Sequence, residues 1–121
     1  MKVVLLRADC DTGRTCPNLN LSDRATIVVQ GYVVAEDALA DLGPNVPSGA
    51  RVVELPLSLV PELRDGAPDL PVHLTSRDTV MVWGPEVTDS EALAKLAPPP
   101  GEAVIELPIG ALPLPEVAHV G

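Results

Sequence analysis

The segment Asp23–Gly31 decides how the rest of the chain is interpreted, because the chain contains this segment twice. It reads DRATIVVQG, and about 53 residues downstream the segment Ser76–Gly84 reads SRDTVMVWG. Each copy continues into a short helical pattern and then into a Val-Val/Ile-Glu-Leu-Pro run, which ends at Pro56 or Pro108. A period of this size indicates one supersecondary unit used more than once.

Each copy is predicted to fold as strand, strand, short helix, strand. Polar and apolar residues alternate in the first strand, and β-branched residues fill the second. The predicted helices are 36–42 and 89–96, and the last strands are 51–55 and 103–107. The expected fold class is therefore α+β, with two tandem repeats related by an approximate two-fold axis.

The two repeats are expected to form one domain, because roughly 50 residues alone would bury too little apolar surface for secure stability. The first unit is residues 1–63, which includes an apolar strand ahead of the repeat. Residues 64–70 form a linker rich in turn residues, and residues 71–121 form the second unit. Such a pseudo-dimer is typical of descent from a homodimer.

Composition excludes some functions. Eight basic against seventeen acidic residues give a net charge of −9, and the chain has one Trp, one Tyr and no Phe. Nucleic-acid binding requires clustered Lys and Arg, and single-strand binding also requires aromatic platforms, so direct nucleic-acid binding is not expected. No apolar run reaches the ~18 residues of a membrane span. We expect a cytoplasmic protein with no membrane contact.

Four residues at matching places in the two copies are candidates for binding a partner or ligand. Arg24 and Arg77 occupy equivalent turns beside an acidic residue, where they would either clamp an anion or pair locally. Tyr32 and Trp83 end equivalent strands, where they would either anchor a partner or close the core.

The remaining polar candidates give weaker signals. Glu54 and Glu106 are equivalent strand carboxylates, which would serve acid–base chemistry if they converge or else face solvent. Cys10 and Cys16 are separated more widely than the tight pairs of thiolate zinc sites. We interpret them as two separate thiols, with a local disulfide or a metal site as alternatives. His73 is expected on the surface, and no metal or cofactor is predicted.

The first copy resembles small actinobacterial proteins of unknown function that are often encoded near helix-turn-helix regulators of the XRE type. The likeness rests on Cys16-Pro17, on the turn SDRAT at 22–26, on VVQGY at 28–32 and on the strand ending in Glu-Leu-Pro. A looser likeness to the BldB-like accessory proteins of these regulators runs through residues 76–78. The second copy lacks the Cys-Pro and has Trp83 in place of Gln30.

These observations favour a non-enzymatic, acidic protein-interaction module. The resemblance implies an accessory role to a helix-turn-helix transcriptional regulator, which would be the protein partner. The alternative is a small enzyme or ligand-binding protein with a site at the interface between the repeats. A homodimer is left open.

Overall fold

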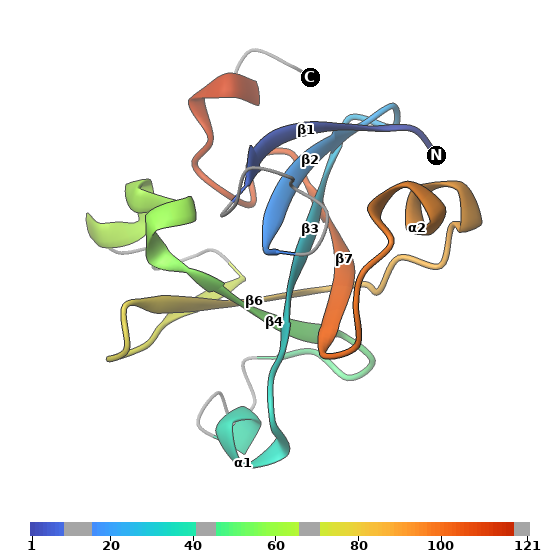
Figure 1. Cartoon of the computed structure of the whole chain (residues 1–121). Helices are drawn as coiled ribbons and strands as arrows, with labels where there is room; N and C mark the ends of the chain where they lie inside the picture. Colours follow the sequence, from blue (N-terminus) through green and yellow to red (C-terminus); the bar gives the residue numbers. More distant parts are fainter. Residues whose placement is uncertain (9–15, 41–45, 66–70, 118–121) are drawn as a thin grey trace.

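The computed structural model of the protein describes residues 1–8, 16–40, 46–65 and 71–117, which form mainly antiparallel β-structure (Figure 1). Every pairing between the seven strands of the sheet is antiparallel. The strand order is β1-β2-β3-β4-β6-β5, and β7 pairs with β3 off this path. The strands are β1 (Val3–Ala8), β2 (Asn18–Ser22), β3 (Thr26–Val33), β4 (Arg51–Pro56), β5 (Val72–Leu74), β6 (Thr79–Gly84) and β7 (Glu102–Pro108).

The predicted α+β class is wrong, because helices contribute little to the described part of the chain. α1 (Glu36–Leu39) has 4 residues and no side-chain cap, and residues 41–42 of the predicted helix lie outside the described residues. The hydrogen bonds of a single turn do not offset the conformational entropy that is lost when a helix is nucleated. α2 (Ser90–Leu96) has 7 residues, and Asp89 caps it by accepting from the N–H of Ala92. The described residues also form the short 3-10 turns η2 (Leu57–Leu59), η3 (Pro61–Asp65) and η4 (Pro115–Val117).

The longest strand pairings in the molecule join one copy of the repeat to the other. β3 pairs with β7, and Thr26 lies opposite Pro108. β6 pairs with β4, and Thr79 lies opposite Pro56. The two registers correspond position by position, because the repeated residues occupy the same places in both pairs. In Figure 1, β4 and β6 run across the direction of β3 and β7. Most of the predicted linker, residues 66–70, lies outside the described residues.

Two equivalent glycines allow strands to approach closely where these pairs cross. A Cβ built on Gly31 would lie 2.9 Å from the carbonyl oxygen of Glu54, and one built on Gly84 would lie 2.7 Å from Cδ2 of Leu107. A Cβ atom almost never makes contacts this short, so a larger residue at either position would force the neighbouring atoms to shift. The central core behind this crossing is aliphatic and includes Leu19, Ile27, Val29, Val53, Leu55, Val80, Val82, Ile105 and Leu107.

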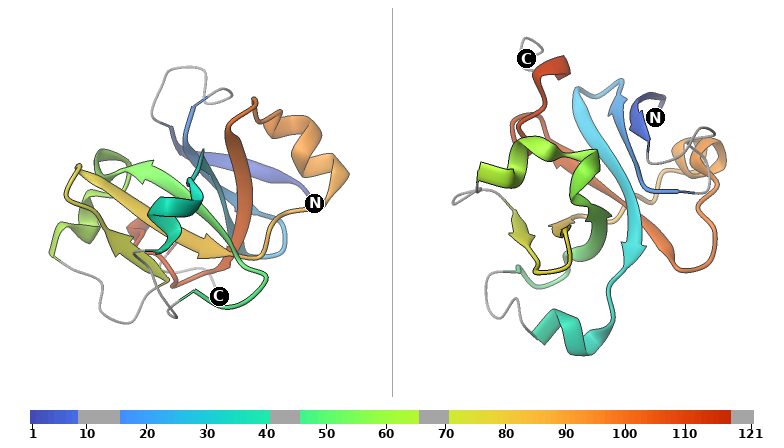
Figure 2. Two further views of the ribbon diagram at one scale, coloured as in Figure 1. Left: turned by 90° about the horizontal axis from the view of Figure 1, so that it is seen from below. Right: turned by 60° about the vertical axis from the view of Figure 1, so that its left-hand side comes forward.

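Two smaller apolar clusters lie under the helices, which are well apart in both views of Figure 2. α2 packs Ala92 and Leu96 against a cluster that contains Val28 and Val104. α1 packs Leu39 against a second cluster, made of Val34, Val52, Met81 and Trp83. The short helices are thus held by side-chain packing on the sheet.

Arg7 connects β1, which precedes the repeat, to the 3-10 turns η2, η3 and η4. Its guanidinium donates to both carboxylate oxygens of Glu62 at 2.8 and 2.7 Å and to both of Glu116 at 2.7 Å. It also donates to the carbonyl oxygen of Leu59 at 3.0 Å. The hydrogen bonds from Arg7 hold the pKa of the Glu62 and Glu116 carboxyl groups below their usual value. Arg7 therefore stabilises the end of the sheet that carries β1.

Candidate functional site

The two turns that carry Arg24 and Arg77 have the same internal structure. In the first turn, the hydroxyl of Ser22 accepts hydrogen bonds from the backbone N–H groups of Arg24 and Thr26, both at 3.1 Å. In the second, the hydroxyl of Thr75 accepts from the N–H groups of Arg77 and Thr79, at 3.1 and 3.3 Å. A short hydroxyl side chain that accepts from the backbone two residues ahead is a standard way to build a tight turn.

Each turn includes one non-glycine residue with positive φ, Ala25 at 58° in the first and Asp78 at 60° in the second. This left-handed conformation is disfavoured for residues with a Cβ. Hydrogen bonds to the hydroxyls of Ser22 and Thr75 hold the turns in this shape. The arginines are therefore presented by rigid turns.

Glu54 and Glu106 act as structural acceptors, each for the turn of the other copy. The hydroxyl of Thr26 donates to Oε2 of Glu106 at 2.5 Å, and the hydroxyl of Thr79 donates to Oε2 of Glu54. Burial alone would raise the pKa of Glu54, but the hydrogen bonds from Thr79 and Arg77, with the charge of Arg77, outweigh it and lower this pKa. A lowered pKa makes the Glu54 carboxylate a weaker base.

The four charged candidates do not converge on one ligand site. Arg77 donates to Glu54 at 2.8 Å, whereas Arg24 faces Asp89 at a distance of 3.7 Å. The side chains of both arginines are 58% exposed. Three hollows on the described part of the chain are lined by other residues than these arginines and glutamates.

Tyr32 is an exposed aromatic residue on β3. Its side chain is 47% exposed, and on β3 it lies directly opposite Glu54 of β4 and Glu102 of β7. Residues directly opposite across antiparallel strands share a face of the sheet. An exposed aromatic ring thus has a carboxylate residue on each side, and we call Glu54, Tyr32 and Glu102 the Tyr32 row. Glu102 accepts a hydrogen bond from Nε2 of Gln30 at 3.0 Å, which fixes its position.

Trp83 is mainly a core residue. Its exposed fraction is 9%, and it packs with Val34, Val52 and Met81 under α1. Part of the ring lines an open apolar hollow that includes Pro71. Tyr32 and Trp83 do not share one role in the structure, because Trp83 matches Gln30 in the sequence and Tyr32 lies two positions beyond it.

Cys16 is buried and disulfide-bonded, which differs from the prediction of two separate thiols. Cys10 lies outside the described residues. No group of three or more metal-binding side chains occurs within residues 1–8, 16–40, 46–65 and 71–117. His73 is exposed on β5.

Sequence reasoning missed a row of buried amides on the outer face of the first copy. Asn18 Nδ2 donates to Oε1 of Gln30 at 3.2 Å, and Asn20 Nδ2 donates to Oδ1 of Asn18 at 2.6 Å. Through Gln30 this row connects to Glu102 and so to the Tyr32 row. The alternation of Asn18 and Asn20 with leucines was the available signal, but it predicts a solvent-facing side, whereas both residues are buried here.

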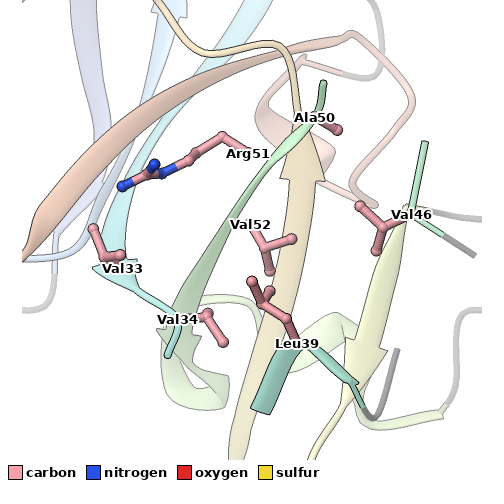
Figure 3. Close-up of a pocket in the computed structure, with 7 residues that line it drawn as sticks. All are labelled: Val33, Val34, Leu39, Val46, Ala50, Arg51 and Val52. Atoms are coloured by element: carbon pink, nitrogen blue, oxygen red, sulfur yellow. The ribbon is translucent and has the colours of Figure 1, made fainter. Parts of the chain in front are cut away.

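Sequence reasoning also missed Arg51, which lines a hollow beneath α1 (Figure 3).

Comparison of the chain with protein-family models, with curated proteins and with solved structures finds no match. Among the described helices, none is both long enough and apolar enough to cross a membrane.

Proposed function

We propose that the protein is a non-enzymatic interaction module that binds a basic segment of a partner protein through the Tyr32 row. The observation that carries this proposal is the exposed ring of Tyr32 between Glu54 and Glu102 on neighbouring strands. Tyrosine is enriched among the residues that dominate binding energy at protein interfaces. An arginine or lysine of the partner would lie over the ring and next to the carboxylates.

The charge of the whole chain supports a basic partner. A net charge of −9 attracts a positively charged surface over a distance set by the ionic strength. Arg77 neutralises Glu54 in part, so Glu102 carries most of the free charge in the row. Association with the partner is therefore expected to be faster at low salt than at high salt.

The resemblance of residues 16–56 supports a helix-turn-helix regulator as the partner. Such a regulator presents basic residues to DNA, and an acidic module complements that surface. This proposal places the protein in the cytoplasm as a regulatory accessory. A site between the repeats receives no such support, because Arg77, Glu54 and Glu106 are engaged in holding the two turns.

The test is a titration of the purified protein with the helix-turn-helix regulator encoded nearest to it in its own genome. Tyr32→Ala should weaken binding at least about tenfold, because it removes the anchor. Tyr32→Phe keeps the ring and should keep most of the affinity. Val33→Ala is the matched control, since Val33 is the exposed neighbour of Tyr32 at 40%. Equal affinity of wild type and Tyr32→Ala would refute the Tyr32 row as the binding surface. Absence of binding to the regulator would refute a helix-turn-helix protein as the partner.

A further inference from the structure

The hollow beneath α1 is a separate feature from the Tyr32 row and has different chemistry. It has a volume of about 500 Å³ and lies between α1, the end of β3 and the start of β4. Its apolar lining is entirely aliphatic: Val33, Val34, Leu39, Val46, Ala50 and Val52. Among the described residues that line it, Arg51 is the one that carries a charge, so this lining combines an apolar wall with a single cation.

Figure 3 shows how these groups are arranged. Arg51 extends from β4 toward the end of β3, where Val33 lies. Val34, Val52 and Leu39 lie together away from the guanidinium. A ligand in this hollow would therefore meet the cation with one end and the aliphatic wall with the other.

Within the described part of the chain, Arg51 lacks the partners that a guanidinium normally has. Its Nε is buried and has no hydrogen-bond partner, and no ion pair of Arg51 is found among the described residues. Leaving a buried donor unsatisfied is costly, and an unpaired polar atom in a native structure often marks the place of an ion or ligand.

The fold itself does not require an arginine at this register. Arg51 lies opposite Gly84, and the equivalent residue of the second copy, Ala103, lies opposite Gly31. The second copy thus makes the same strand pairing with Ala103, whose side chain is a single methyl group. The long cationic side chain has to be explained by something other than the strand pairing.

We propose that the hollow binds an aliphatic monocarboxylate, with the carboxylate on Arg51 and the hydrocarbon against Val34, Leu39 and Val52. Guanidinium and carboxylate match in a planar, two-point hydrogen bond, which would satisfy Nε. The volume lies within the range of small-molecule sites. One carboxylate matches the single cation, whereas a dianion would leave one charge unpaired in an acidic protein.

The experiment is a calorimetric titration of the full chain with octanoate, and with octanamide as the neutral analogue. Octanoate should bind at one site, and octanamide should bind at least about tenfold more weakly, because only the acid forms a charged hydrogen bond. Arg51→Ala, which copies Ala103, should weaken octanoate roughly 10- to 100-fold. Arg64→Ala, at an exposed arginine on η3, is the matched control and should bind like wild type.

The comparison of acid and amide on the wild-type protein decides the question even where Arg51→Ala does not fold. Lack of saturable octanoate binding, or equal affinity for octanoate and octanamide, overturns the site. Equal octanoate affinity of a folded Arg51→Ala variant also overturns it. Tyr32→Ala should leave octanoate binding unchanged, so the failure of this proposal and the failure of the interaction module are separate results.

Discussion

The two copies of the repeat share their strand pairing and their turns, yet they differ on the outer face of the sheet. Gln30 of the first copy joins a row of buried amides, whereas Trp83 at the equivalent position packs among Val34, Val52 and Met81. The repeated residues, such as Gly31 and Gly84, are those that build the crossing of the strands. The strand pairing therefore depends on the residues that the two copies share. The packing on each copy differs where their residues differ, as at Gln30 and Trp83.

The largest effect is expected at the shared glycines. Gly31→Ala would place a Cβ 2.9 Å from the backbone oxygen of Glu54, so it should lower the free energy of unfolding by about 3 kcal/mol. Gly84→Ala would place a Cβ 2.7 Å from the movable end of the Leu107 side chain and 3.0 Å from the backbone oxygen of Glu106, which are fewer close contacts than at Gly31, and it should cost about 1–2 kcal/mol. Urea unfolding measures both. Equal losses would show that backbone and side-chain contacts constrain the two crossings alike.

A smaller effect is expected where the copies diverge. Gln30→Leu should lower the free energy of unfolding by about 2 kcal/mol, because it removes an acceptor from Asn18 and a donor from Glu102 in a buried row. The control is Trp83→Leu, which creates a cavity but removes no hydrogen-bond partner from a buried amide. Thermal unfolding of both variants tests the point, and a Gln30→Leu protein as stable as wild type would show that the amide row contributes nothing net.

The smallest effect is expected at the arginines of the two turns. Arg77→Ala should lower the free energy of unfolding at pH 7 by about 0.5 kcal/mol, because the pair with Glu54 is partly exposed. The lowered pKa of Glu54 means that this contribution is present above about pH 4.5 and is lost as the pH falls through the folded-state pKa. The difference between wild type and Arg77→Ala should therefore shrink as the pH falls below about 4.5.

The matched control for this pH dependence is Arg24→Ala, whose partner Asp89 lies 3.7 Å away. It should reduce stability less than Arg77→Ala, because the longer separation weakens the interaction. Denaturant unfolding at several pH values between 3 and 7 provides the measurement. A larger loss for Arg24→Ala than for Arg77→Ala would contradict the assignment of Glu54 as the tighter partner.

Much of the strand content followed from local pattern, but the fold class did not. The β-branched runs at 26–30 and 79–83 fall within β3 and β6, because alternation and β-branching favour extended backbone locally. The helix of the first copy was overestimated, since α1 has only 4 residues in the described chain. A single turn suffices to pack Leu39 against the cluster that contains Val52, so a longer helix is not needed there.

The candidate site was predicted only in part. Tyr32 was named as a partner-binding residue and is exposed, but its acidic neighbours come from two other strands that no local pattern brings together. The sequence does not mark Arg51 as a binding residue, because an arginine at the start of a strand ordinarily faces water. Its lack of a partner is visible only when the surroundings of Nε are known.

The sequence by itself determined the repeated unit, the acidic charge and the position of most strands, because these depend on residue type and on spacing along the chain. Only the tertiary structure decided that β3 pairs with β7 and β4 with β6, and that Glu54 and Glu106 hold the opposite turns. Pairing between distant strands depends on which backbone groups find partners and on which side chains fit together at the crossing. These are properties of the folded chain, and local spacing does not contain them.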